Sequence, residues 1–87
     1  MRDENFDVAV TIETDQIGRY LTVTRVGQAA DFLLHRWPTT KGPMHRAAMQ
    51  ALMDAMEQRK AVMAARKAFT AAAKEADIFV REGRQFD

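Results

Sequence analysis

Hydrophobic and polar residues alternate one by one near the start of the chain. The apolar series is Phe6, Val8, Val10 and Ile12, and the positions between and after these are Asp7, Ala9, Thr11 and Glu13. A period of two is typical of a β-strand with one buried face, so the pattern predicts a strand over residues 6–13. Residues 20–25 are rich in β-branched side chains and follow the turn-prone segment TDQIGR, which predicts a second strand and an antiparallel hairpin. Because an isolated hairpin is marginally stable in water, helices must cover its apolar face.

The period changes at Val26 to that of an amphipathic helix. One side of this helix is predicted to carry Val26, Ala29, Ala30, Leu33, Leu34 and Trp37, and the opposite side Asp31, His35 and Arg36. Pro38 disfavours helical geometry at the residue before it, so the predicted helix spans residues 26–37. After a loop, Pro43 suits the first turn of a second helix, where its missing N–H is no loss.

The long segment 44–82 contains neither glycine nor proline, yet the phase of its apolar residues argues against one continuous helix. The apolar residues of 44–56 centre near Leu52, whereas those of 61–76 would be rotated by about 130° on the same helix. One straight helix cannot bury both stripes against one core. We therefore predict two helices, 43–57 and 60–77, joined by a turn in the polar run EQRK, with a partly continuous helix as the alternative.

The end of the chain completes the predicted fold. Ile78 would fall within the basic face of the third helix if that helix continued, so residues 78–80 are predicted to be a short extended segment and 81–87 a flexible tail. The fold class is α+β: an N-terminal β-hairpin packed by three helices in the order β-β-α-α-α, with residues 78–80 as a candidate third strand. Residues 1–87 are expected to form a single domain, because their number suffices for one small core.

Composition excludes several kinds of chemistry. The chain has no cysteine and no serine, so disulfides, thiolate zinc sites and the commonest nucleophiles are ruled out. It also lacks a glycine-rich phosphate loop and an HExxH motif, and we expect no enzymatic activity, no cofactor and no metal. The acidic, polar N-terminus does not resemble a secretory signal and no apolar run of membrane-spanning length follows, so we expect a cytoplasmic protein that does not bind membranes.

The segment RWPTTKGPMHR, residues 36–46, joins the first two helices and holds the first candidate site. His45 projects into the apolar arc of the second helix and lies close in sequence to Trp37. The favoured interpretation is structural, with His45 bonded to a carbonyl of the PTTKG loop. The alternative is an anion site made by His45, Arg46 and the free N–H groups at the helix start. His35 is predicted to face the other way, which argues against a metal site.

Three methionines form the second candidate, a self-association surface. They are Met49, Met53 and Met56, which recur at helical spacing along one edge of the second helix. Methionine fills irregular cores and also suits adaptable partner surfaces, and core packing is the favoured interpretation. The apolar arc of this helix is wider than one contact needs, so dimerisation stays open.

Basic residues on the third helix form the third candidate. They are Arg59, Lys60, Arg66, Lys67 and Lys74, whereas the N-terminal segment is acidic. Clustered positive charge on one helix face suits phosphate backbones, so nucleic acid is one candidate partner. A solvated face is the favoured interpretation, because the whole chain is nearly neutral and no aromatic residue is interleaved with the basic ones.

Three segments, AADFLLHRWP, GPMHRAA and AARKAFTAAAKEADIFV, resemble a family of small bacterial proteins catalogued as domain of unknown function 982. Its recurrent positions correspond here to Trp37-Pro38, Gly42, His45, Ala48, Ala65-Arg66, Ala68-Phe69, Ala72-Ala73, Glu75-Ala76 and Ile78. The resemblance implies a stand-alone domain with no established activity. The family tends to have glycine near the positions of Gln58 and Asp77, so polar residues must make both turns in this chain.

Taken together, these patterns favour a small, non-enzymatic, self-associating protein-interaction module, which we expect to be a homodimer or to bind another protein. The alternative is a nucleic-acid-associated protein that uses the basic face of the third helix. Ligand binding near Trp37 and His45 is a third possibility.

Overall fold

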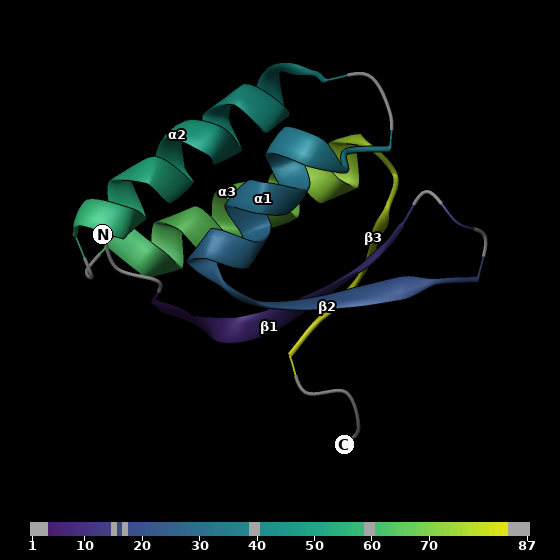
Figure 1. Cartoon of the computed structure of the whole chain (residues 1–87), viewed down its shortest axis with the longest axis horizontal. Coiled ribbons are helices and arrows are strands. Elements are labelled where there is room, and N and C mark those ends of the chain that lie inside the picture. Colours follow the sequence, from purple (N-terminus) through teal and green to yellow (C-terminus); the bar gives the residue numbers. More distant parts are fainter. Residues whose placement is uncertain (1–3, 15, 17, 39–40, 59–60, 84–87) are drawn as a thin grey trace.

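The computed structural model describes residues 4–14, 16, 18–38, 41–58 and 61–83. Its elements are β1 (Asn5–Glu13), β2 (Tyr20–Arg25), α1 (Val26–His35), α2 (Pro43–Glu57), α3 (Val62–Glu75) and β3 (Phe79–Glu82). The strands form an antiparallel sheet in the order β2-β1-β3, and the helices form a layer on one face of it (Figure 1). The predicted α+β fold, including the third strand, is confirmed.

The core lies between the sheet and the helices. Val10 and Ile12 of the central strand are completely buried, as their alternation predicts, and so is Val23 of β2. Phe69 of α3 is also fully buried and packs against Phe6 of β1, with the ring centroids 6.2 Å apart. The hairpin therefore gains from the helices the apolar cover that it could not provide for itself.

Alanines line the contact between α2 and α3. Ala48 and Ala55 of α2 and Ala65 and Ala72 of α3 have no exposed surface. Their short side chains let the two backbones approach closely. Two helices, α2 and α3, form where the phase of the apolar residues predicted them, and residues 59–60 of the predicted turn lie outside the described residues.

The first helix differs from the prediction in its end and in one buried residue. It ends at His35 and not at Trp37, because the chain leaves helical geometry at Arg36 ahead of Pro38. Leu34, predicted to be buried, is 54% exposed, whereas Phe32 is only 1% exposed. Phe32 packs edge-on against Trp37, so the buried stripe of α1 is shifted toward Phe32.

The prediction of a flexible tail over residues 81–87 was wrong for its first part. Arg81 and Glu82 belong to β3 and pair with Thr11 and Val10 of β1. β1 leaves a row of backbone N–H and C=O groups unpaired on the side away from β2, and β3 satisfies them. This requirement belongs to β1 and is not visible in the sequence of residues 81–82.

The end of α3 is a Schellman turn built without glycine. Asp77 adopts the left-handed conformation with φ of 62°. Its N–H donates to the Lys74 carbonyl, and the N–H of Ile78 donates to the Ala73 carbonyl. Ile78 is 7% exposed and joins the core next to Ala73, which is the hydrophobic contact that accompanies this turn. The turn thus directs the chain from α3 into β3.

Replacing Asp77 with glycine is expected to raise the free energy of unfolding by about 0.5–1 kcal/mol, because glycine adopts positive φ without a steric penalty. Asp77→Ala should lower it, since alanine lacks the local polar contacts that help aspartate to tolerate this conformation. Urea denaturation of the two variants measures both changes. A glycine variant less stable than the parent would contradict the assignment.

Candidate functional site

His45 fastens α2 to the end of α1. Its side chain is buried, and Nε2 lies 2.9 Å from the carbonyl oxygen of Leu33. A carbonyl only accepts, so Nε2 carries the proton and donates. The imidazole also lies edge-on to the indole of Trp37, with 5.2 Å between the ring centroids. The bond was expected to reach the PTTKG loop. Its partner is instead in the last turn of α1, where carbonyls lack intrahelical donors.

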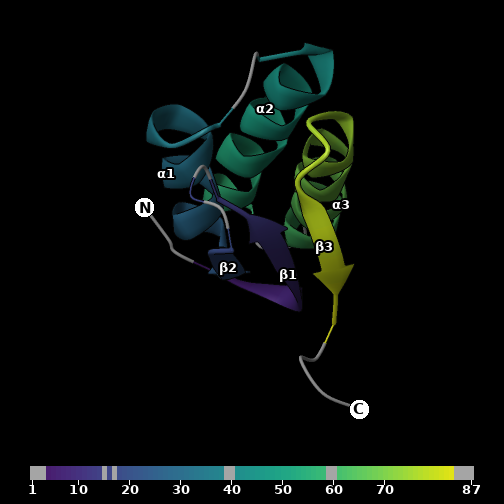
Figure 2. The same cartoon turned by 90° about the vertical axis from the view of Figure 1, so that its right-hand side faces the viewer.

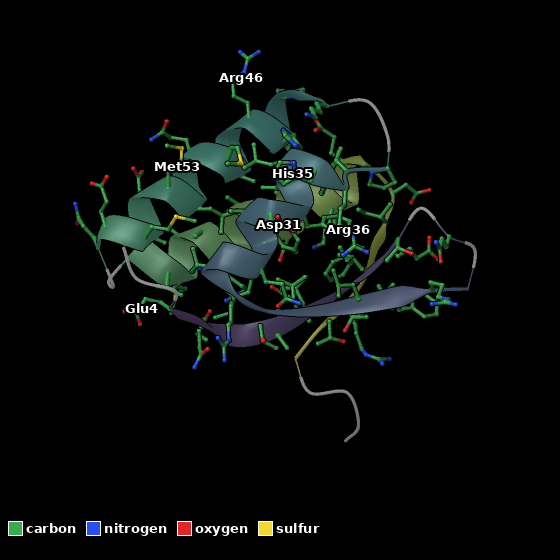
Figure 3. All side chains as sticks on the ribbon, viewed as in Figure 1. Glu4, Asp31, His35, Arg36, Arg46 and Met53 are labelled. Atoms are coloured by element: carbon green, nitrogen blue, oxygen red, sulfur yellow. The ribbon has the colours of Figure 1, made fainter. Side chains whose placement is uncertain are left out.

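A carboxylate of the chain itself already occupies the place predicted for an external anion. Glu75 of α3 accepts a hydrogen bond from the backbone N–H of Met44 at the start of α2, with an N···O distance of 3.1 Å. Gly42 makes room for it, since a Cβ there would lie 2.5 Å from Glu75 Oε1. Arg46 extends away from the helices into solvent (Figure 3), while His45 is buried. The arrangement is that of a helix cap.

The prediction that Arg66 belongs to an exposed basic face was wrong. Its side chain is only 11% exposed and makes two hydrogen bonds to Asp7 of β1, of 3.2 and 3.1 Å. A third hydrogen bond joins it to Glu82 of β3, which also accepts from the Thr70 hydroxyl at 3.1 Å. Arg66 therefore ties α3 to two strands, and its charge is neutralised within the molecule.

The protonation of this cluster follows from its contacts. Hydrogen bonds from Arg66, helped by its positive charge, hold the pKa of Asp7 below the usual value for an aspartic acid. The hydrogen bonds to Asp7 and then to Glu82 raise the pKa of Arg66. Asp7 and Arg66 thus both stay ionised over the physiological range.

Two described lysines remain on the outer side of α3. Lys67 and Lys74 are both exposed, and the ammonium of Lys74 lies 5.0 Å from the centre of the Phe79 ring on β3. They border an open groove of about 330 Å³ between α3 and β3. Arg59 and Lys60 lie outside the described residues. Within the described residues the basic face consists of Lys67 and Lys74, because Arg66 is paired with Asp7 and Glu82.

The three methionines divide between core and surface. Met49 and Met56 are half-buried and pack against the core, in line with the favoured interpretation. Met53 is 53% exposed and lies on the outer side of α2, away from the sheet (Figure 3). Of the predicted self-association residues, only Met53 offers substantial apolar surface to a partner.

Sequence reasoning missed the partners of Arg66 and the cap made by Glu75. One signal was available, because Arg66 lies four residues after Val62 and three before Phe69, on the buried side of α3. A charged residue within a buried stripe requires a partner. The identity of that partner was not readable, since Asp7 is 59 positions away in sequence.

Within the described parts of the chain, no group of three or more histidine, aspartate or glutamate side chains is placed to hold a metal ion. None of the described helices combines the length and apolar character needed to cross a membrane.

Comparison with known proteins identifies a family and no individual relative. Neither a curated protein nor a solved structure was found to match the chain. A family model described as "Protein of unknown function (DUF982)" matches residues 8–80, which is most of the sequence. The chain therefore belongs to the DUF982 family.

Proposed function

We propose that this protein is a non-enzymatic interaction module that self-associates through the outer side of α2. The observation that carries this proposal is a stripe of exposed residues along that helix. The α2 stripe consists of Arg46, Gln50, Met53 and Glu57. Spacings of four, three and four residues keep its members on one side of the helix, opposite the buried alanines.

The α2 stripe is complementary to itself in antiparallel orientation. A two-fold axis between Gln50 and Met53 would place Arg46 of each copy opposite Glu57 of the other, with each Met53 opposite Gln50. Two ion pairs would then flank two methionines, and the flexible thioethers can adjust to a partner surface. A two-fold interface uses the same patch on both subunits, which is what this pattern supplies.

Nucleic-acid association is the alternative, carried by Lys67 and Lys74 on α3. The pairing of Arg66 with Asp7 and Glu82 weakens it, because a neutralised arginine releases no counterions on binding a phosphate backbone. This function would appear as salt-dependent binding of a mixed-sequence oligonucleotide that is lost in a Lys67→Glu, Lys74→Glu variant.

Sedimentation velocity over a range of protein concentrations tests self-association. We expect Met53→Glu to raise the dissociation constant at least about tenfold, because it places a carboxylate at the centre of the contact. Met63→Glu is the matched control, since Met63 is 52% exposed on α3 and lies outside the α2 stripe.

A charge exchange makes this test specific for the antiparallel arrangement. Arg46→Glu and Glu57→Arg alone should each weaken association, and the double variant should restore it. A parent protein that remains monomeric at high micromolar concentration would refute the proposal, as would equal effects of the Met53 and Met63 variants.

A further inference from the structure

The two edge strands of the sheet, β2 and β3, differ in the hydrogen bonding of their outward-facing backbone groups. On the β2 edge, Gln28 of α1 accepts a hydrogen bond from the backbone N–H of Thr24 at 2.9 Å and donates one to the Thr22 carbonyl at 3.4 Å. Its side-chain amide thus pairs with β2 in the way that a peptide group of a neighbouring strand would. This edge is protected against addition of another strand.

Among the residues that the structure describes, no side chain covers the β3 edge in this way. The carbonyl of Ile78 accepts from Glu13 and the N–H of Gly83 donates to Ala9, so both groups point toward β1. Backbone groups alternate in direction along an antiparallel strand, which directs the N–H and C=O of Glu82 away from β1. Among the described elements, none lies beyond β3 on this side (Figure 2).

A groove runs between this open edge and α3. It is lined by Arg66, Lys67, Thr70, Ala71, Lys74 and Glu82. The pair Arg66–Glu82 and the contact between Lys74 and Phe79 both connect α3 to β3. Arg66 is neutralised by Asp7 and Glu82, and Glu82 is also bonded to Thr70, so the free positive charge of the groove comes from Lys67 and Lys74. Within the described residues, no carboxylate pairs with Lys67 or Lys74, and the groove is therefore electropositive.

We propose that the β3 edge and this groove bind an acidic, extended peptide segment of a partner protein, which adds to the sheet as a fourth strand. Backbone hydrogen bonds to β3 would supply the pairing, and the lysines would select acidic side chains. Alternate residues of the added strand point toward α3 at intervals of about 7 Å. Lys67 and Lys74 are two helical turns apart, about 10 Å along the axis, so acidic residues at positions i, i+2 and i+4 fit within reach of both.

This site does not depend on the α2 stripe, which lies on a different helix. Loss of self-association through Met53→Glu would leave it intact. The two proposals can therefore fail separately.

Fluorescence anisotropy with a labelled peptide tests the site. The probe alternates glutamate with threonine or valine over eight or so residues, about the length of a long strand. We expect saturable binding to the intact protein at low salt and at least a tenfold weaker affinity, about one decade in dissociation constant, for the Lys67→Glu, Lys74→Glu variant. Lys41→Glu is the control, because Lys41 is exposed in the segment before α2.

A second peptide separates strand addition from simple charge attraction. Methylation of the backbone nitrogens on the side facing β3 removes donors and leaves the charges unchanged, so it should abolish binding. Equal binding of the methylated peptide would overturn the proposal, as would no binding of the first peptide. Tighter, lysine-dependent binding of a single-stranded oligonucleotide would also overturn it and assign the surface to nucleic acid. Circular dichroism of the lysine variants confirms that they are folded.

Discussion

Replacing Arg66 with methionine is expected to lower the free energy of unfolding by about 2–3 kcal/mol. Methionine retains much of the apolar stem but none of the donors, so Asp7 and Glu82 would lose their hydrogen-bonded partner. Hydrogen bonds between ionised groups are stronger than neutral ones, and Arg66 is itself mostly buried. The side chains of Asp7 and Glu82 are each about one third exposed, so water can replace part of the lost hydrogen bonding. This solvation sets the upper limit of the expected decrease in the free energy of unfolding.

The ion pair between Arg66 and Asp7 also makes the free energy of unfolding depend on pH in a defined direction. The pKa of Asp7 is lower in the folded protein than in the unfolded chain, because Arg66 stabilises its ionised form. The resulting stabilisation is complete above the unfolded pKa of about 4 and is lost as the pH falls through the lower folded value. The stability difference between the parent and Arg66→Met should therefore narrow on acidification below about pH 4.

Urea denaturation at neutral and acidic pH measures both effects. Lys67→Met is the matched control, because Lys67 is the next residue of α3, is exposed, and pairs with no carboxylate of the described chain. Its stability should change little, as for most exposed sites. If the two methionine variants were equally stable, Arg66 would not hold α3 to the sheet.

Replacing Phe69 with alanine is expected to lower the free energy of unfolding by about 3–5 kcal/mol. The ring has no exposed surface and packs against Phe6 at the centre of the contact between α3 and the sheet. Its removal loses buried apolar area and leaves a cavity. The neighbouring alanines, Ala65, Ala72 and Ala73, are too short to fill this cavity.

Chemical denaturation of Phe69→Ala and of Phe69→Leu provides the comparison. Leucine retains most of the apolar volume, so its cost should be well below that of alanine. A loss below about 1 kcal/mol in the alanine variant would mean that Phe69 is not a central core residue. Calorimetry replaces denaturant if the alanine variant is already partly unfolded in buffer.

Local patterns were sufficient for the elements and their order. Alternation at residues 6–13 identified β1, and the change of period at Val26 identified α1. The shift in apolar phase between Leu52 and Phe69 separated α2 from α3 without any glycine or proline to mark the break. Each of these signals comes from neighbouring residues that share one face, so the sequence contains them directly.

The hydrogen-bond and ion-pair partners that a side chain meets on another helix or strand could not be predicted from local patterns. His45 was recognised as a polar residue in an apolar arc, but its acceptor proved to be Leu33 and not the loop. Arg66 was assigned to the basic face although its spacing from Val62 and Phe69 places it beside the buried stripe, because a helical projection does not show which residues another element brings opposite it. Asp7 and Glu82 become its neighbours only when β1 and β3 pair beneath α3.

The sequence by itself determined that this chain forms a hairpin, three helices and a final extended segment, because periodicity and helix-breaking residues act over a few positions. Only the tertiary structure decided which charges are free. Packing α3 across the sheet neutralised Arg66 with Asp7 and Glu82, and packing α3 beside α2 placed Glu75 on the start of that helix. Packing also left one sheet edge covered by Gln28, and among the described residues no side chain covers the other edge beside Lys67 and Lys74. Hydrogen bonds and ion pairs depend on distances between residues far apart in sequence, and only the assembled layers set those distances.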